Sequence, residues 1–234
     1  MASLHKLYSR LDFVTFQEDQ ISNLAAKKNV ASQTADLIES GQVVGAGSGS
    51  TSFLVLGEVA ARIDSGQLEN ISMVPTSLEV RWMLNRLRIP CHELSYSCPD
   101  WIFDGADQVD PQGNLIKGRG GALLQEKLLF QSSSLRRVLV DESKMVDCLD
   151  GAVPVEVVPR AVEVVVPRLE ALGAESILVR RGSGKDGPVI TEQGNVLLDC
   201  SFERISDSLE VDLAAVPGVV ESGLFIGYRP QIML

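Results

Sequence analysis

The stretch from Val43 to Ile63 reads VVGAGSGSTSFLVLGEVAARI, and it decides the fold class. An apolar strand, a glycine-rich turn and a helix follow one another in it, which is the arrangement of a strand-helix unit in a parallel sheet. The turn, residues 45–51, contains three glycines, two serines and a threonine. Such a turn can offer backbone N–H groups and hydroxyls to an anion. A tight strand-to-helix turn without any ligand is the competing interpretation.

Two familiar nucleotide-binding signatures do not fit this turn. The dinucleotide fingerprint needs a third glycine where Ser50 stands and an acidic residue about twenty residues further on. The next strand, ISMVPTS (residues 71–77), ends without that acidic residue. A Walker A loop needs a lysine before its serine or threonine, and the turn has none. The turn is therefore interpreted as a simple phosphate cradle.

The same alternation of strands and helices continues towards residue 144. Hydrophobic residues make up 45% of the chain and aromatic residues only 5%, a bias typical of sheets covered on both faces. We therefore predict an α/β, Rossmann-like domain with a mainly parallel sheet. Its further expected segments are a helix at 21–39, a strand at 71–76, a helix at 77–87, a strand at 101–107, a helix at 121–131 and a strand with a turn at 136–144.

The pattern changes after Asp150, where short strands follow one another. We predict a smaller inserted α+β domain of the ferredoxin-like kind at residues 149–219, with residues 1–148 and 220–234 forming the Rossmann-like domain. The small domain is also a possible oligomer contact. Its expected segments are strands at 154–159, 175–181, 188–194 and 195–202, a helix containing a proline at 160–173, a helix at 206–216 and a last strand at 218–227.

Charged residues follow the strands of the first domain. Asp104 and Asp107 end one strand, Lys117 precedes a glycine-rich turn, and Glu126 lies in the helix after that turn. Lys144 follows another strand. Ligands of open α/β sheets bind beyond the carboxyl ends of the strands, so these groups can meet in one cleft. Two acids there could hold sugar hydroxyls or move protons.

Each of these residues also has a structural interpretation. Aspartates are favoured in turns and helix caps, and Glu126 and Lys127 could be ordinary surface residues. Lys144 could simply be solvated. The basic loop RRGSGKDG (residues 180–187) is interpreted as an exposed hairpin connection.

Charge and cysteine usage exclude several classes of protein. The net charge is −10 and no long basic run occurs, so broad binding to nucleic acid or to an anionic membrane is not expected. No apolar stretch reaches the roughly 20 residues that a membrane helix needs. The chain has two histidines and no C-x-x-C spacing, so a structural zinc site has little support. The cysteines are interpreted as reduced thiols of a cytosol-like compartment: Cys91, Cys98, Cys148 and Cys200.

The motifs GAGSGST, DGADQVD, IKGRGGALLQEK, VDESK and GNVLLD occur in the order seen in the A-type ribose-5-phosphate isomerases, which the chain resembles from about residue 22 to residue 228. The resemblance implies an enzyme that interconverts D-ribose 5-phosphate and D-ribulose 5-phosphate in the pentose phosphate pathway. It also implies a reaction without metal or cofactor. A related amino-sugar-phosphate isomerase or lactonase, and a sugar-phosphate sensor without turnover, are the alternatives.

Residue roles follow from the resemblance position by position. Glu126 matches the general base, which moves a proton between C2 and C1 through an ene-diolate. Asp104 and Asp107 match the acids that hold the sugar and help to open it, and Lys117 matches a lysine that stabilises the ene-diolate. The implied substrate-binding residues are Ser48, Gly49, Ser50, Thr51, Gly105, Ala106, Gly118, Arg119, Gly120, Lys144 and Lys27.

Four departures from the family pattern occur at or beside these residues. Ser48 stands where threonine is common, and it keeps the hydroxyl. Arg119 replaces a frequent glycine, Gln108 stands where an acid often follows DGAD, and Gln125 stands where arginine often precedes the glutamate. The resemblance further implies a homodimer or homotetramer in the cytoplasm, with a plastid as the alternative if residues 1–20 are a trimmed presequence. Neither nucleic acid nor a membrane is an expected partner.

Overall fold

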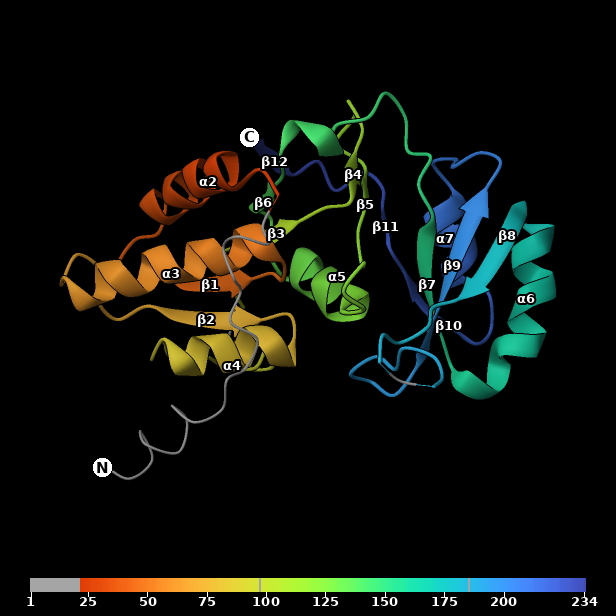
Figure 1. Ribbon diagram of the computed structural model, residues 1–234, viewed down its shortest axis with the longest axis horizontal. Coiled ribbons are helices and arrows are strands. Elements are labelled where there is room, and N and C mark those ends of the chain that lie inside the picture. Colours follow the sequence, from red (N-terminus) through yellow and green to blue (C-terminus); the bar gives the residue numbers. More distant parts are fainter. Residues whose placement is uncertain (1–21, 97, 185) are drawn as a thin grey trace.

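The computed structural model of the chain describes residues 22–96, 98–184 and 186–234, so the possible presequence at 1–20 lies outside the described residues. Figure 1 shows an elongated molecule made of two lobes, with the red-to-yellow part of the chain at one end and much of the blue part at the other.

The first lobe contains a five-stranded sheet in the order β12-β6-β3-β1-β2. Every neighbouring pair in it is parallel, which confirms the predicted parallel sheet. Strands β2 and β3 lie on opposite sides of β1, so the strand order reverses at β1. The strands are β1 (Val43–Ala46), β2 (Ser72–Pro75), β3 (Trp101–Gly105), β6 (Arg136–Leu139) and β12 (Gln231–Met233).

Helices cover both faces of this sheet, as the contacts of successive side chains along β3 show. Trp101 and Phe103 pack with the helices before β3, whereas Ile102 packs with Leu129 and Phe130 of the helix after it. Alternate residues of a strand point to opposite faces, so one strand supplies both cores. The helices are α2 (Leu24–Asp36), α3 (Ser50–Asp64) and α4 (Leu78–Arg86) on one face and α5 (Leu123–Ser132) on the other.

The second lobe is a four-stranded antiparallel sheet in the order β10-β7-β9-β8. Its chain order is strand, helix, strand, strand, helix, strand, which together with this sheet order is the ferredoxin-like arrangement that the sequence predicted. Two helices pack on one face through Val165 and Leu169 and through Leu209 and Leu213. The elements are β7 (Val153–Val157), η3 (Pro159–Ala161), α6 (Val162–Ala171), β8 (Ala174–Val179), β9 (Val196–Phe202), α7 (Leu209–Ala214) and β10 (Val219–Ser222).

A small antiparallel sheet, β11-β5-β4, lies between the two lobes (Figure 1). The chain passes from β10 into β11 through Gly223, whose N–H donates to the Pro154 carbonyl over 2.7 Å and whose carbonyl accepts from the Lys117 N–H over 2.8 Å. A Cβ atom at position 223 would overlap the Lys117 carbonyl, so this approach requires glycine. The strands are β4 (Gln108–Val109), β5 (Leu115–Ile116) and β11 (Leu224–Phe225).

Two strand predictions are wrong. The expected strand at 188–194 forms only isolated bridges, between Arg181 and Pro188 and between Ile190 and Val196, because β8 pairs directly with β9 and leaves this segment outside the sheet. The expected strand at 218–227 is divided into β10 and β11, which join different sheets. In both cases the pairing of distant strands overrode the local pattern.

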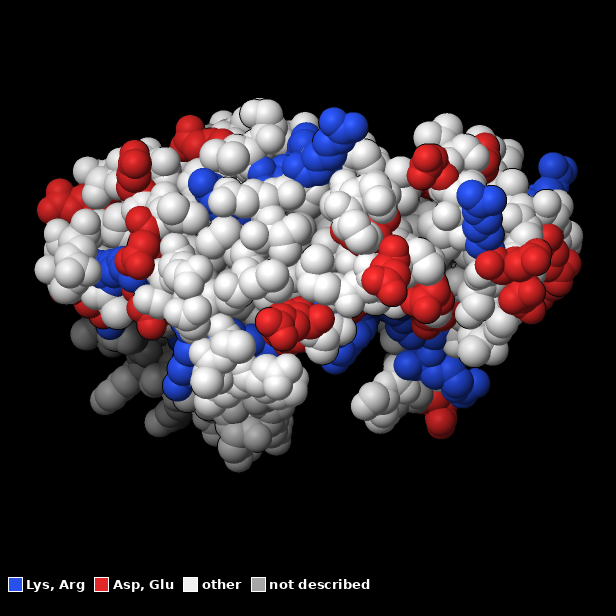
Figure 2. Space-filling view, turned by 90° about the horizontal axis from the view of Figure 1, so that it is seen from above, with Lys and Arg blue, Asp and Glu red and all other residues white. Residues whose placement is uncertain are grey.

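Charged side chains of both signs occur on the surface of the molecule (Figure 2). On the face shown in Figure 2, basic and acidic side chains are interspersed over both lobes. No helix within the described ranges is both long enough and apolar enough to cross a bilayer.

Candidate active site

A cavity of about 550 Å³ opens beyond the carboxyl ends of β1, β3 and β6, where the strand order reverses. This is the place where open α/β sheets bind ligands. Every residue that the sequence predicted for the site lines this cavity. These residues come from α2, from the turns after β1 and β3, from the turn before α5, from α5 itself and from η2 (Glu142–Lys144). They are Lys27, Ser48, Gly49, Ser50, Thr51, Asp104, Gly105, Ala106, Asp107, Lys117, Gly118, Arg119, Gly120, Glu126 and Lys144.

Lys117 is the centre of a buried charged group. Its ammonium lies 2.9 Å from Oδ2 of Asp104 and 3.2 Å from Oε2 of Glu126, and it donates to the Gly105 carbonyl over 2.5 Å. The three charged side chains are only 3–4% exposed. The rings of Phe130 and Phe225 lie beneath the ammonium, with centroids 5.7 and 5.6 Å away. Because two carboxylates share one cation here, the group holds an excess of negative charge when all three are ionised.

Burial and this charge balance alter the acidity of the group. Burial raises the pKa of Asp104 to about 7; the ammonium of Lys117 opposes the rise, and the carboxylate of Glu126 adds to it. Burial by itself would lower the pKa of Lys117, but the two carboxylates outweigh it and raise that pKa above its ordinary value. Lys117 therefore stays a cation in the site, while Asp104 is able to exchange a proton near neutral pH.

Glu126 lies in the first turn of α5, and its side chain is buried rather than exposed, so the surface interpretation is wrong for it. Its Oε1 accepts from the Ser48 hydroxyl over 3.4 Å. Among the described residues, its buried Oε2 has no hydrogen-bond partner, although it is paired electrostatically with Lys117. A carboxylate oxygen with this spare capacity, on the cavity wall, is suited to accept a proton.

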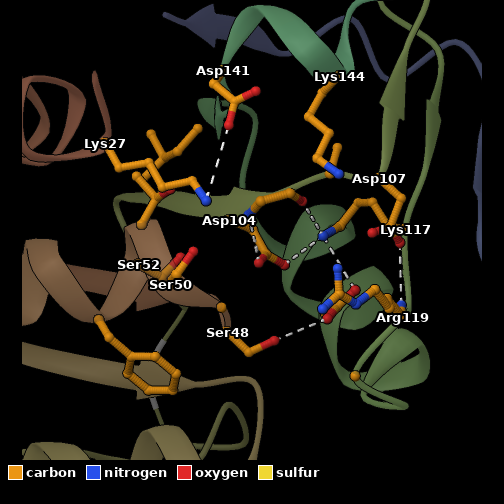
Figure 3. A pocket seen from close by; sticks show the side chains of 18 of the residues that line it. Lys27, Ser48, Ser50, Ser52, Asp104, Asp107, Lys117, Arg119, Asp141 and Lys144 are labelled. Atoms are coloured by element: carbon orange, nitrogen blue, oxygen red, sulfur yellow. Dashed lines mark hydrogen bonds and ion pairs between the residues drawn. The ribbon is translucent and has the colours of Figure 1, made fainter. Parts of the chain in front are cut away.

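Asp107 lies in the turn between β3 and β4 and contacts the turn that follows Lys117. Its Oδ2 accepts from the backbone N–H of Arg119 over 3.3 Å. Figure 3 shows Lys144 and Lys27 entering the pocket from opposite sides of Asp104. Lys144 therefore lines the pocket, where it is partly exposed.

The glycine-rich turn leads into the first turn of α3, with Gly49 at the N-cap position and a φ of 101° that favours glycine. The first N–H groups of a helix have no partner inside the helix, so Ser50 and Thr51 present backbone donors and hydroxyls together. Lys27 reaches the same side of the pocket and lies 4.0 Å from Asp141. This arrangement can hold a phosphate.

Some lining residues were not predicted. Asp141 follows β6, much as Asp104 lies near the end of β3. Its carboxylate accepts from the Ser143 N–H over 3.0 Å, and the hydrogen bonds from Ser143 lower the pKa of Asp141. The strand-then-acid pattern of VDESK could have indicated it. The other unpredicted lining residues are Ser22, Ser52, Phe53, Glu79, Leu139 and Ser143.

Lys127 was also interpreted as a surface residue, and it is buried. Its ammonium lies 2.7 Å from Glu210, 2.8 Å from Glu221 and 2.7 Å from the Leu224 carbonyl. It therefore ties α5 to the second lobe, directly beside Glu126. Within the described residues, no group of three or more His, Cys, Asp or Glu side chains could hold a metal ion.

Comparison with known proteins gives a consistent result. The sequence profile of "Ribose 5-phosphate isomerase A (phosphoriboisomerase A)" matches residues 72–234. The chain is 42% identical to the ribose-5-phosphate isomerase A of Natronomonas pharaonis, over 90% of this chain and 92% of the relative. It is 44% identical to that of Thermosynechococcus vestitus, over 89% and 90% of the two chains.

Solved structures resemble the whole described fold. A D-ribose-5-phosphate isomerase in complex with phospho-erythronic acid superposes with a TM-score of 0.85 and 38% identity, covering 89% of this chain and 93% of the other. Ribose 5-phosphate isomerase A from Methanocaldococcus jannaschii gives a TM-score of 0.84 and 38% identity, covering 87% and 92%.

Proposed function

Because this chain belongs to the ribose-5-phosphate isomerase A family, we propose that it interconverts D-ribose 5-phosphate and D-ribulose 5-phosphate through an ene-diolate. The observation that carries the proposal is the position of the Lys117 ammonium between Asp104 and Glu126 on the cavity wall. Aldose–ketose exchange moves a proton between adjacent carbons and leaves negative charge on oxygen. It therefore needs a base and a cation at the same place.

Glu126 is the base in this proposal. Its carboxylate takes the proton from C2 of the open-chain aldose, and the electron pair of that C–H bond forms the C1–C2 double bond of the ene-diolate. The same carboxyl group then returns the proton to C1, the proton of the C2 hydroxyl passes to the oxygen on C1, and the ketose carbonyl forms at C2. One carboxylate on one face of the substrate is sufficient for both transfers.

Lys117 and the backbone donors of its turn stabilise the ene-diolate oxygens. Lys117 is held in place before the reaction by Asp104 and by the Gly105 carbonyl, so little reorganisation is needed as charge develops. Asp104 and Asp107 bind sugar hydroxyls, and Asp104 helps to open the ring. The raised pKa of Asp104 suits a group that passes a proton to or from a sugar hydroxyl.

The turn at residues 48–51 holds the phosphate, with Lys27 and Lys144 adding positive charge. Binding energy from the phosphate then positions the reacting end of the sugar. The similar solved structure contains phospho-erythronic acid, which joins a phosphate to a carboxylate that resembles an ene-diolate. This ligand supports separate positions for the phosphate and for the reacting end of the sugar.

The decisive experiment measures turnover of ribose 5-phosphate by wild type, Glu126→Gln and Glu175→Gln, with a metal chelator present. Glu175 is an exposed residue of β8 and serves as the control for loss of a carboxylate. We expect wild type and Glu175→Gln to be active and Glu126→Gln to be slower by roughly 100- to 10,000-fold. Near-full activity of Glu126→Gln would refute the assigned base, and an inactive wild type would refute the proposed reaction.

We further propose that the protein forms a homodimer or homotetramer and acts in the cytoplasm. The exposed apolar residues Leu178 and Val179 on the edge strand β8 support self-association through the second lobe. The four cysteines are unpaired, as is usual in a reducing compartment. Sedimentation velocity measures the first proposal, and fluorescent tagging in cells tests the second.

A further inference from the structure

Arg180 connects the second lobe to the turn that follows Lys117. It stands just after β8, and its Nη1 donates to the Gly118 carbonyl over 3.0 Å and to the Arg119 carbonyl over 2.8 Å. The basic loop beginning at residue 180 was predicted to be exposed, and that prediction is wrong for Arg180, which is half-buried. Its side chain reaches from the second lobe to the backbone of the turn that borders the cavity of the first lobe.

Asp199 fixes the direction of this side chain. Nε of Arg180 donates to Oδ2 of Asp199 over 2.9 Å, and Nη2 donates to Oδ1. The backbone N–H of Arg180 also donates to the Leu197 carbonyl over 2.9 Å, so both ends of the residue are attached to β9. A planar guanidinium held by two parallel bonds has a defined orientation, which leaves Nη1 aimed at the turn.

The two accepted carbonyls determine where the neighbouring N–H groups point. In a trans peptide the C=O and the following N–H point in opposite directions, and the described residues contain no cis peptide bond. Arg180 holds the Arg119 carbonyl, and together with the Gly121 N–H (3.0 Å) it holds the Gly118 carbonyl, so the N–H groups of Arg119 and Gly120 point away from Arg180. The Arg119 N–H does reach Asp107 in the cavity. A Cβ atom on Gly120 would lie 3.9 Å from the Ser48 hydroxyl, which places Gly120 at the cavity wall.

Other contacts already join the lobes. Lys127 binds Glu210 and Glu221, and Glu192 accepts from the Leu78 N–H over 2.6 Å. What distinguishes Arg180 is that it contacts the backbone of the turn that carries the reacting donors.

We propose that Arg180, oriented by Asp199, is a positioning residue that aims the backbone N–H groups of Arg119 and Gly120 at the reacting end of the sugar. The Arg119 N–H fixes Asp107, and the Gly120 N–H serves the ene-diolate oxygen. This inference rests on the proposed isomerase function. It makes the second lobe part of the catalytic apparatus, although its side chains do not touch the substrate.

The test compares wild type, Arg180→Ala, Arg180→Lys and Arg181→Ala. Arg181 is the adjacent, exposed arginine and controls for loss of one positive charge. For Arg180→Ala we expect kcat to fall on the order of 10- to 100-fold while KM stays within about 3-fold, because removing one oxyanion donor outright costs roughly 100- to 1,000-fold. Arg180→Lys should recover part of kcat, and Arg181→Ala should match wild type.

A second readout separates positioning from loss of structure. Inhibition by phospho-erythronic acid should weaken in Arg180→Ala in parallel with kcat. Inhibition by inorganic phosphate should stay unchanged, since the hydrogen bonds of Arg180 in the described structure go to Asp199 and to the turn at residues 118–119, not to the phosphate turn at residues 48–51. Equal kcat in Arg180→Ala and Arg181→Ala, or equal weakening of both inhibitors, would overturn the inference. If Arg180→Ala does not fold, Arg180→Lys and Asp199→Asn are judged by the same two readouts. An inactive wild type refutes the proposed function instead.

Discussion

Gly47 stands directly against the carboxylate of Asp104, and a Cβ atom at position 47 would overlap Oδ1 and Cγ of that side chain. The N–H of Gly47 also donates to the Phe103 carbonyl over 2.8 Å, so the turn has little room to move away. The turn after β1 and the acid at the end of β3 are therefore fitted to each other.

Gly47→Ala should displace Asp104 and with it Lys117. We expect a loss of about 1–3 kcal/mol in the free energy of unfolding, as for other overpacked sites. We also expect kcat to fall roughly tenfold or more, since misplacement by about 1 Å can cost on the order of 100-fold. Urea unfolding and steady-state kinetics measure both effects.

Gly57→Ala is the matched control. Gly57 lies within α3, and a Cβ atom there would have no neighbour within 4 Å. Alanine should leave activity unchanged and stabilise the protein by about 0.5–1 kcal/mol. If Gly47→Ala had the activity and stability of this control, the close contact between Gly47 and Asp104 would not be needed for catalysis.

Lys117→Met should destabilise the protein by about 3–5 kcal/mol, because it leaves two buried carboxylates without their cation. Turnover should fall to background. Adding Asp104→Asn removes one of the two negative charges, so the double variant should regain part of the lost stability and none of the activity. Chemical unfolding of the two variants gives the comparison, and equal stability of Lys117→Met and wild type would contradict the buried ion group.

The raised pKa of Asp104 predicts a pH-dependent stability difference. The carboxyl has a pKa of about 7 in the folded protein and an ordinary value near 3.8 in the unfolded chain, so the folded state binds the proton more tightly. Its stabilising contribution is fully present below the unfolded value and is lost as pH rises from about 4 to about 7. Wild type should therefore lose stability relative to Asp104→Asn across this range.

The measurement is the difference in thermal midpoint between wild type and Asp104→Asn at several pH values from 4.5 to 8. Other titrating groups are common to both proteins and largely cancel in the difference. A difference that stayed constant with pH would show that Asp104 does not titrate there.

The first lobe was predictable because its signals are local. The apolar strand ending at Ala46, the glycines after it and the helix starting at Ser50 all lie within one short segment. The ferredoxin-like lobe was predicted from strand spacing, but the segment 188–194 has strand-like residues without a strand partner. The bounds assigned to the two domains, at residues 149 and 219, stay a prediction.

Long-range partners explain what the sequence did not reveal. Lys127 looks like any helical lysine until Glu210 and Glu221 are brought to it from the second lobe. Arg180 stands in a loop of polar and glycine residues, and its role depends on Gly118 and Arg119 of the other lobe. Glu126 was identified through the family resemblance, since helical spacing alone did not separate it from a surface acid.

Strand β12 has a consequence for how the chain acquires its structure. It completes the edge of the parallel sheet by pairing with β6, yet the whole ferredoxin-like lobe lies between the two strands in the chain. Loop closure over such a distance is slow, and contacts between distant residues slow folding in general. On the ribosome, the second lobe is therefore synthesised before β12 is available to complete the sheet of the first lobe. We expect the two lobes to reach the native state in one late, cooperative step.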